Sequence, residues 1–560
     1  MAKGLMGLDF AIIGLYFAAV FALAIWVTIK ERRSKAQNYD STDYFLGGKN
    51  LGWFVIGASL FASNIGSEHL VGLAGSGARG DMPAAHFELL AALVLMVLGW
   101  VFVPFYIKSG VFTMPEFLER RYSSSARNYL SIVSIVAYIL TKISITIFAG
   151  ALVFEVLGLE FWTGAVLVVV ATGIYTIFGG LRAVVYTDMM QMFIFLFAAG
   201  AITYYGLEAL GGWGGMTTAI NEAGGTATSA KYFNLWRPMS DPDFPWTGIL
   251  FGAPILGIWY WCTDQFIVQR VLSAPNSNEA RKGALFASAL KLLPLFLFVI
   301  PGAIAFALSQ RNLLDLGGNP DQALPAMITD FLPTGVKGLV LAGLLAALMS
   351  SLSSVFNSCS TLFTIDFYKR WKPAASEKEL VFTGQVATVV LVVISLVWIP
   401  FMRAMMEGGG FYKYLQSIQA YISPPIAAAF LLGLFIKRIN ARGAIVALWT
   451  GFAIGLLRLV LEYMKNTNAL APGSVLDSFA SINFLHFAII LFVISAVIML
   501  VVSRTAPAYG PEKLKNVTYE RTEDMTEAFS FANRDFWITI LIIAVVFAIW
   551  FIFSPLGIAN

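Results

Sequence analysis

The sequence predicts an all-α membrane protein with about fourteen transmembrane helices, and three observations lead to this fold class. Hydrophobic residues make up 58% of the 560 residues and charged residues only 12%, whereas a soluble domain carries about 25% charged residues. Apolar runs of about twenty residues recur along the chain, and each can cross roughly 30 Å of hydrocarbon as a helix. The ten-residue alternation typical of a transmembrane β-barrel does not occur in the sequence.

The apolar runs give the position of each expected span. A short Gly-Gly step at residues 179–180 separates two of them and is expected to form a tight turn. A longer polar stretch, residues 504–533, is expected to form a cytoplasmic loop with an interfacial helix. The spans are expected near residues 9–29, 51–77, 84–107, 126–155, 160–179, 184–208, 246–273, 283–309, 334–365, 381–404, 411–436, 441–463, 482–503 and 534–554.

The distribution of lysine and arginine predicts the orientation of these spans. Of the 37 basic residues, 25 lie in the loops that follow odd-numbered spans or within three residues of those span ends, 9 lie likewise on the opposite side, and three lie deeper within spans. Because basic residues are retained on the cytoplasmic side, this asymmetry places both termini outside. The sequence therefore predicts a multi-pass protein of the cell membrane.

Two polar interruptions within apolar spans predict an internal repeat. The second span contains ASNIGSEH from Ala62, and the seventh contains WYWCTDQ from Trp259. Broken helices at membrane depth occur where they line a cavity, and transporters often carry them at matching positions of two inverted repeats. The predicted division is residues 1–50 with the first span, 51–208 as the first five-helix repeat, 209–245 as an outside loop, 246–436 as the second repeat, and 437–560 with three C-terminal spans.

Two ionisable residues lie inside predicted spans and require an explanation. Glu88 lies in the third span and Lys291 in the eighth. A charge within a bilayer is costly, so each residue is a candidate for a functional site. One interpretation is a structural ion pair or side chains that reach an interface. The other is that Glu88, Lys291 and the amide of Gln416 supply hydrogen-bond donors and acceptors to a neutral polyhydroxyl solute.

Hydroxyl groups are concentrated in the ninth span, around Ser350, Ser351 and Ser354. Small hydroxylated residues often serve close helix packing, but six hydroxyl or amide groups within nine residues favour a cation site. Asp188, at the start of the sixth span, can add a charged ligand or can act as a helix N-cap. Tyr260 and Trp261 can be core aromatics or can stack on a ring-shaped solute beside the broken helix.

Other residues carry no chemistry in this interpretation. Lys142 and Arg458, each within a span, are taken as structural or snorkelling residues. The two cysteines both fall inside spans, so they predict no disulfide framework. No nucleotide-binding loop, HExxH or CxxC motif occurs in the sequence. We therefore expect neither an enzyme nor a partner nucleic acid, but a protein whose partners are the lipid bilayer, an ion and a small solute.

Long motifs resemble the sodium:solute symporter family and, within it, the sodium/glucose cotransporters. The resemblance covers residues 40–503 and is carried by GASLFASNIGSEHLVGLAGSG from Gly57, WYWCTDQFIVQRVLSA from Trp259 and LMSSLSSVFNSCSTLFTID from Leu348. It implies a LeuT-like fold, in which two inverted five-helix repeats each begin with a broken helix. It also implies sodium, Na+, as the co-transported ion. Three positions, Leu89, Ala91 and Lys413, depart from residues common in relatives.

The resemblance implies site residues by position in this sequence. The sugar site implied is Asn64, His69, Glu88, Tyr260, Trp261, Lys291 and Gln416. The main sodium site implied is Ala62, Ile65, Ala347, Ser350 and Ser351, and a possible second sodium site is Ser63, Asp188, Ser353 and Ser354.

The function expected from these observations is sodium-coupled uptake of a glucose- or galactose-type hexose by alternating access. Two alternatives remain open. One is a sodium symporter for another solute, such as inositol or sialic acid. The other is a sugar-gated sensor or ion channel, although Gln416 is kept and sensor-like relatives carry a charged residue there.

Overall fold

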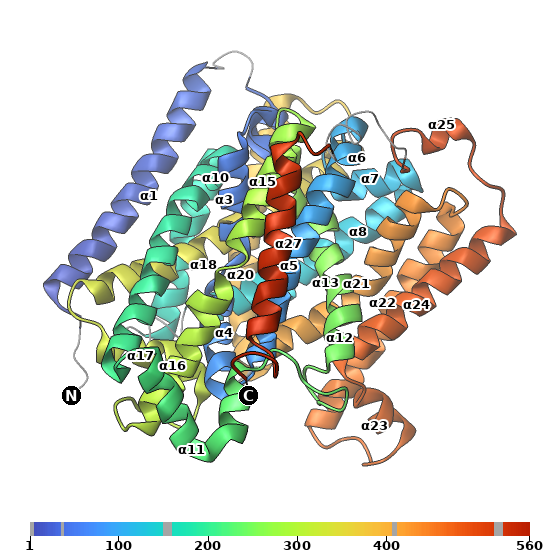
Figure 1. The fold of residues 1–560 in the computed structure, drawn as a ribbon. Coiled ribbons are helices and arrows are strands. Elements are labelled where there is room, and N and C mark those ends of the chain that lie inside the picture. Colours follow the sequence, from blue (N-terminus) through green and yellow to red (C-terminus); the bar gives the residue numbers. More distant parts are fainter. Residues whose placement is uncertain are drawn as a thin grey trace.

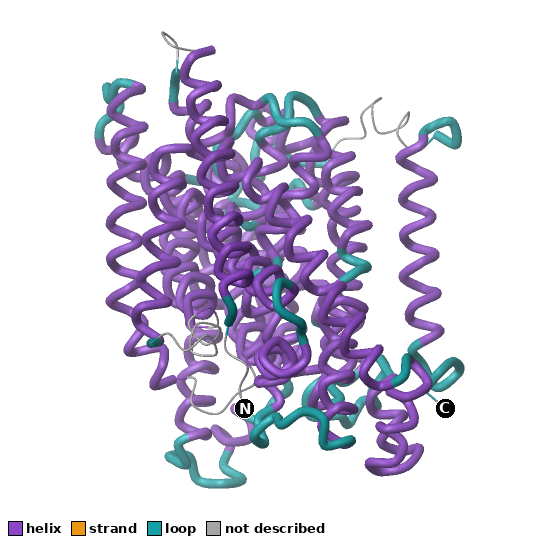
Figure 2. The backbone as a smooth tube through the Cα atoms, turned by 90° about the vertical axis from the view of Figure 1, so that its left-hand side faces the viewer, coloured by secondary structure: helices purple, strands orange, loops and turns teal. Residues whose placement is uncertain are grey.

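The computed structural model describes residues 5–34, 39–148, 150, 160–405, 411–519 and 530–559, and the fold of these residues is helical throughout (Figures 1 and 2). Within the described residues the β structure amounts to one isolated bridge between Arg237 and Pro245. The helices are α1 (Gly7–Ser34), α2 (Ser41–Leu46), η1 (Gly47–Lys49), α3 (Trp53–Asn64), α4 (Ser67–Arg79), η2 (Met82–Ala85), α5 (His86–Val97), η3 (Leu98–Phe102), α6 (Val103–Ser109), α7 (Met114–Arg121), α8 (Ser124–Ala137), η4 (Tyr138–Ile143), α10 (Phe161–Leu210), α11 (Trp213–Phe233), α12 (Trp246–Phe251), α13 (Ala253–Gly257), η5 (Ile258–Thr263), α14 (Gln265–Leu272), α15 (Ser277–Leu290), η6 (Leu295–Val299), α16 (Ile300–Gln310), η7 (Pro320–Gln322), α17 (Ala323–Phe331), α18 (Val336–Thr361), η8 (Leu362–Tyr368), α19 (Lys369–Trp371), α20 (Glu377–Met405), α21 (Phe411–Phe435), α22 (Ala441–Asn466), α23 (Val475–Ala480), α24 (Phe484–Val502), η9 (Ser503–Thr505), α25 (Pro511–Leu514) and α27 (Arg534–Ile552).

Eleven helices of the described chain are long and apolar enough to cross a membrane. The difference from the fourteen expected spans lies in three places. The second and seventh expected spans, near 51–77 and 246–273, are divided into shorter helices, α3 with α4 and α12 to α14. The fifth and sixth expected spans are joined in α10. The fold class is as predicted, and the count of fourteen remains a prediction.

The two spans joined in α10 are separated by a glycine. A straight helix of the 50 residues in α10 would be roughly 75 Å long, more than twice the thickness of the hydrocarbon core. Gly180 leaves the helical conformation, with φ 58° and ψ −165°, and its position agrees with the turn expected at residues 179–180. Only glycine adopts this backbone region readily.

Two broken helices position the candidate site. The helix α3 ends at Asn64, Ile65 leaves the helical conformation with φ −79° and ψ 90°, Gly66 is extended, and α4 begins at Ser67. The amide of Gly66 donates to the carbonyl of Asn64, two residues back, instead of continuing the helical ladder. At the second break, the π-helical turn η5 ends at Thr263, and Asp264 adopts an extended conformation before α14. Both breaks lie where the polar interruptions in the sequence predict them.

Burial differs between the central and the peripheral helices. The serine-rich helix α18 is almost completely buried, whereas most of α1 and α27 is exposed. Exposed large apolar side chains on α1 and α27, such as Leu15 and Leu541, suit contact with lipid chains. A helix that carries many hydroxyl groups is accommodated in a membrane when protein surrounds it. The fold therefore places the polar helix at the centre of the bundle.

The two ends of the described chain lie at the same end of the molecule. Figure 1 shows the start of α1 and the end of α27 there, together with α11, α17 and α23, and Figure 2 marks both ends of the chain at the same end of the molecule. An even number of membrane crossings produces this arrangement. The assignment of that end to the outside of the cell rests on the distribution of basic residues and remains a prediction.

Two polar segments differ in detail from a plain loop. The expected outside loop, residues 209–245, contains the helix α11, which is interrupted at Gly224 and Gly225. In the expected cytoplasmic loop, residues 504–533, the described part contains the four-residue helix α25, and residues 520–529 lie outside the described residues.

Replacement of Gly180 by alanine tests the turn within α10. A Cβ at this position would lie 2.5 Å from the carbonyl oxygen of Tyr44, and φ is +58°. We expect Gly180→Ala to lower the stability by at least about 1–3 kcal/mol because of backbone strain. The measurement is thermal unfolding of the purified protein in detergent. Gly200→Ala in the same helix is the control, since its Cβ would meet no atom within 4 Å; equal melting temperatures for both variants would contradict the role of Gly180.

Candidate functional site

A buried ion pair links α15 to α5 near the break between α3 and α4. The ammonium group of Lys291 donates hydrogen bonds to Glu88 Oε2 and to the amide oxygen Oδ1 of Asn64. None of the three side chains is exposed by more than 5%. Both interpretations of Glu88 and Lys291 are thus compatible with the structure, because the two residues form an ion pair and also lie beside the broken helix.

Further polar groups surround the carboxylate of Glu88. Tyr412 donates to Glu88 Oε1 at 3.3 Å, and His69 Nε2 lies 3.9 Å from the same oxygen. Gln416 follows Tyr412 by one helical turn on α21 and lines the same cavity as Glu88. The carboxylate is therefore held by side chains from α4, α15 and α21, as a charge inside a membrane protein must be.

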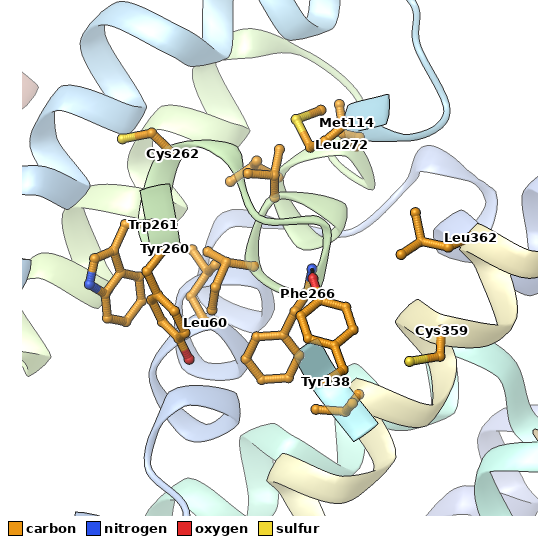
Figure 3. Packing of buried hydrophobic residues seen from close by; sticks show 14 of the residues in the cluster. Leu60, Met114, Tyr138, Tyr260, Trp261, Cys262, Phe266, Leu272, Cys359 and Leu362 are labelled. Atoms are coloured by element: carbon orange, nitrogen blue, oxygen red, sulfur yellow. Dashed lines mark hydrogen bonds between the residues drawn. The ribbon is translucent and has the colours of Figure 1, made fainter. Parts of the chain in front are cut away.

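Aromatic side chains from η5 complete one wall of the site. The hydroxyl of Tyr260 accepts a hydrogen bond of 3.1 Å from Asn64 Nδ2, and the rings of Tyr260 and Trp261 meet edge to face at 5.1 Å. Figure 3 shows these two rings side by side, with Phe266 and Tyr138 next to them. The hydroxyl of Tyr138 accepts a hydrogen bond from the amide of Phe266 at 3.2 Å, which satisfies the backbone where α14 begins.

These residues line one small cavity. Its volume is about 40 Å³, room for a few water molecules at most, so the site is contracted in this conformation. Ala91 lies in its wall, whereas Lys413 forms an ion pair with Asp243. Six of the seven residues implied for the sugar site line this cavity, and the seventh, Lys291, bonds to two of them, Asn64 and Glu88. The lining is Asn64, His69, Phe87, Glu88, Leu90, Ala91, Lys142, Ala253, Leu256, Gly257, Tyr260, Trp261, Gln416 and Gln419.

Lys142 belongs to this cavity as well. It is 5% exposed, and its ammonium group lies 4.9 Å from the centre of the Tyr260 ring. Of the two interpretations of Lys142, the snorkelling one is therefore wrong, because the side chain points into the protein, whereas a structural role stays open. Arg458, in contrast, donates to the carbonyl of Ile482 and contacts Glu462, in agreement with a structural role.

The residues implied for the main sodium site come from the broken helix and from α18. Ser351 donates to the carbonyl oxygen of Ser63 at 3.0 Å, so α18 directly contacts the segment that precedes the break. Ala347 lies one turn before Ser350 and Ser351 on the same face of α18. The structure brings the two segments together, and all five implied residues, Ala62, Ile65, Ala347, Ser350 and Ser351, are buried.

Asp188 is the centre of a second polar network. Ser350 donates to its Oδ1 at 2.6 Å, and Ser59 and Ser63 donate to its Oδ2 at 2.5 and 3.1 Å. Arg270, fully buried on α14, lies 3.3 Å from Oδ2. The N-cap interpretation of Asp188 is wrong, because its carboxylate binds side chains of other helices and lies eight residues beyond the turn at Gly180.

The residues implied for the second sodium site are only partly brought together. Ser354 donates to Ser63 Oγ at 3.1 Å, which joins it to the Asp188 network. Ser353 instead donates to the carbonyl of Ser350 in its own helix.

Several residues that contact these sites were not expected from the sequence, among them Lys142, Tyr412, Arg270 and Ser59. The sequence could have indicated Lys142, since a charged residue within a predicted span is a candidate for a functional site. Tyr412 and Arg270 lie near the ends of expected spans, where aromatic and basic residues are common, so the sequence alone gave no reason to select them.

Comparison with known proteins gives a consistent set of relatives. Residues 44–451 match the model of the sodium:solute symporter family. Sodium/glucose cotransporter 1 of sheep (Ovis aries) is 40% identical over 524 residues, 88% of this chain and 78% of that protein. Human (Homo sapiens) sodium/myo-inositol cotransporter 2 is 38% identical over 546 residues, 93% of this chain and 80% of that protein.

Solved structures share the fold. A Na+-coupled sialic acid symporter in a substrate-bound outward-open state aligns with a TM-score of 0.76 at 23% identity, over 90% of this chain and 99% of that chain. The nucleobase-cation-symport-1 family transporter Mhp1, in a closed conformation, aligns with a TM-score of 0.52 at 13% identity, over 85% and 97%. Both are LeuT-fold transporters, and this likeness establishes the LeuT-like fold of the chain.

Removal of one member of the buried ion pair tests its contribution to stability. Lys291→Ala leaves the carboxylate of Glu88 buried without its main partner, so we expect a destabilisation of about 3–5 kcal/mol. Lys291→Met combined with Glu88→Leu removes both charges and is expected to cost much less. The measurement is thermal unfolding without added solute. Lys282→Ala, a less buried position of the same helix, is the control; a double variant as unstable as Lys291→Ala would contradict the ion-pair interpretation.

Proposed function

Because the chain belongs to the sodium:solute symporter family, whose members are sodium-coupled transporters and not enzymes, we propose that it takes up a glucose- or galactose-type hexose together with sodium. The observation that carries this proposal is that Glu88 and Asn64 line one cavity beside the broken helix and that Lys291 donates a hydrogen bond to each of them.

The cavity has the chemistry that a hexose needs. A sugar carries hydroxyl groups that both donate and accept hydrogen bonds, and less polar ring faces. Glu88 supplies acceptors, Lys291 supplies donors, and the amides of Asn64 and Gln416 supply both. Tyr260 and Trp261 offer flat apolar surfaces beside these groups. In this proposal His69 and Lys142 extend the polar wall around the ring.

The main sodium site lies next to the sugar site in the proposal. Sodium takes oxygen ligands, and unwound backbone carbonyls of broken helices supply them in transporters. Carbonyl oxygens of Ala62, Ile65 and Ala347 and the hydroxyls of Ser350 and Ser351 form the proposed ligand set. The contact between Ser351 and the Ser63 carbonyl supports it, because it holds α18 against the break.

Transport follows from the differential affinity of the two ligands for two conformations. Sodium bound between α18 and the broken helix fixes the relative position of these elements and favours the outward-open state. Sugar then binds between α5, α15, α21 and η5, and closure followed by inward opening releases both ligands. A ligand shifts a conformational equilibrium only through such differential binding. We also propose that residues 51–208 and 246–436 are the two inverted repeats, with both termini outside.

Another solute is the main alternative, because the relatives are named for glucose, myo-inositol and sialic acid transport. Sodium-driven uptake of radiolabelled glucose and galactose into proteoliposomes separates these possibilities. We expect uptake that requires a sodium gradient and that an excess of unlabelled hexose abolishes. Stronger competition by myo-inositol or by sialic acid would replace the hexose assignment by that solute.

A sugar-gated sensor or channel is the second alternative, and electrical measurement distinguishes it. A symporter carries a sugar-dependent sodium current in fixed proportion to accumulated sugar. Sugar-induced current without accumulation would exclude the symporter mechanism.

Gln416→Ala tests the sugar site. Loss of one buried hydrogen bond to the sugar costs about 1–3 kcal/mol, so we expect the apparent affinity for hexose to fall roughly five- to 150-fold. The measurement is the sugar concentration at half-maximal uptake with saturating sodium. Gln310→Ala, at the exposed end of α16, is the matched control; an unchanged half-maximal concentration in Gln416→Ala would remove Gln416 from the site.

Ser351→Ala tests the main sodium site. The substitution removes one oxygen ligand and the hydrogen bond to the Ser63 carbonyl. We expect the sodium concentration for half-maximal uptake to rise about tenfold, with a smaller change in sugar affinity at saturating sodium. Ser395→Ala is the control, since Ser395 bonds within its own helix α20. A sodium dependence equal to that of the unmodified protein would contradict the assignment.

A further inference from the structure

Arg270 is completely buried in the middle of the polar network around Asp188. Its Nη2 lies 3.3 Å from Asp188 Oδ2, and the same nitrogen donates to Ser354 Oγ. Its Nε donates to Ser59 Oγ at 2.7 Å, and Nη1 donates to the carbonyl of Phe266. One guanidinium group on α14 is thus in contact with α3, α10 and α18.

The contacts of Arg270 coincide with the residues implied for a second sodium ion. Asp188 and Ser354 bind the guanidinium directly, and Ser63 hydrogen-bonds to both of them. Of the four residues implied for the second sodium site, Ser63, Asp188 and Ser354 therefore already belong to a network that contains a positive charge. Ser353 takes no part in it and bonds within α18.

A sodium ion and the guanidinium cannot share this network at low cost. Asp188 is the acidic residue in the network, and it is 0% exposed, as is Arg270. Two positive charges within a few ångströms of one carboxylate repel each other, and water does not screen them at this depth. One cation must leave for the other to bind.

We propose that Arg270 is a tethered cation that competes with sodium for Asp188, so that the pairing of Arg270 with Asp188 and the binding of a second sodium ion exclude each other. The inference rests on the proposed sodium sites. In the conformation described, the guanidinium of Arg270 supplies the positive charge beside Asp188, at the proposed second sodium site.

This competition has a mechanical consequence. Arg270 lies on α14, the half-helix that follows the break at Asp264. A sodium ion that displaces the guanidinium also releases the contacts of α14 with Ser59 on α3 and with Ser354 on α18. Binding of sodium at the proposed second site is thereby linked to movement of α14.

Equilibrium binding of 22Na+ to the purified protein, without sugar, tests the proposal. Arg270→Gln removes the charge and keeps an amide donor. We expect Arg270→Gln to bind a second sodium ion at least about tenfold more tightly than the unmodified chain, because a like charge near the site is gone. Arg270→Lys keeps a charge and is expected to resemble the unmodified chain. Addition of Asp188→Asn to Arg270→Gln is expected to abolish the tighter binding.

Arg127→Gln is the matched control, since Arg127 is another buried arginine, paired with Asp366, and no change in sodium affinity is expected there. A folded Arg270→Gln protein that binds sodium equally or more weakly would overturn the proposal. If the unmodified chain and all variants bind no sodium, the proposed sodium sites fail instead, and the two failures are distinguishable.

A measurement on the unmodified chain covers the case in which the variants do not fold. Structures determined in saturating sodium and in choline give the separation of Arg270 and Asp188 directly. We expect the pair in choline and a separated pair in sodium. A sodium ion bound beside Asp188 with the Arg270 contact intact would disprove the exclusion, as would an intact pair and no second sodium ion at saturation.

Discussion

The interruption between α3 and α4 is the constraint on which the candidate sites depend. Because Ile65 leaves the helical conformation and Gly66 is extended, the amide of Gly66 no longer continues the helical ladder. The residues before the break can then form hydrogen bonds with neighbouring elements on opposite sides of α3. The side chain of Asn64 reaches Lys291 and Tyr260 in the cavity, while the carbonyl of Ser63 meets Ser351 of the serine-rich helix. Two consecutive residues therefore join the proposed sugar and sodium sites.

Buried charge is tolerated here because each group has several partners from different helices. Glu88 contacts side chains from α15, α21 and α4, and Asp188 contacts side chains from α3, α14 and α18. Such groups contribute little net stability, since the cost of removing them from water offsets the attraction between them. They do define which helices must lie together, because separation of any pair leaves a charge uncompensated in an apolar surrounding. The same property makes them suitable elements of a conformational change.

The sequence predicted the fold class and both helix breaks. A transmembrane helix requires an apolar run of about twenty residues, and a break within such a helix is marked by a polar interruption of that run. It also selected Glu88 and Lys291 as candidates for a functional site, with a structural ion pair as one of two interpretations, since charges within spans are rare. It did not distinguish Lys142 from a snorkelling side chain, because that depends on which face of the π-helical turn η4 points inward. Arg270 escaped notice for a similar reason: its position near the cytoplasmic end of an expected span suits the positive-inside pattern, and only the packing of α14 against α3, α10 and α18 reveals its burial.

The two broken helices, α3 with α4 and η5 with α14, are connected to each other at two places. On the side of the cavity, Asn64 of α3 donates to Tyr260 of η5 at 3.1 Å; on the side of the cation network, Ser59 of α3 accepts from Arg270 of α14 at 2.7 Å. A sugar that bonds to Asn64 and Tyr260 would act on the first connection, and a cation that binds Asp188 would act on the second. In the proposed mechanism, movement of the two broken helices relative to each other requires both connections to change. Because each ligand would release one of them, we infer that solute and ion are coupled through the geometry of the two breaks, without direct contact between the ligands.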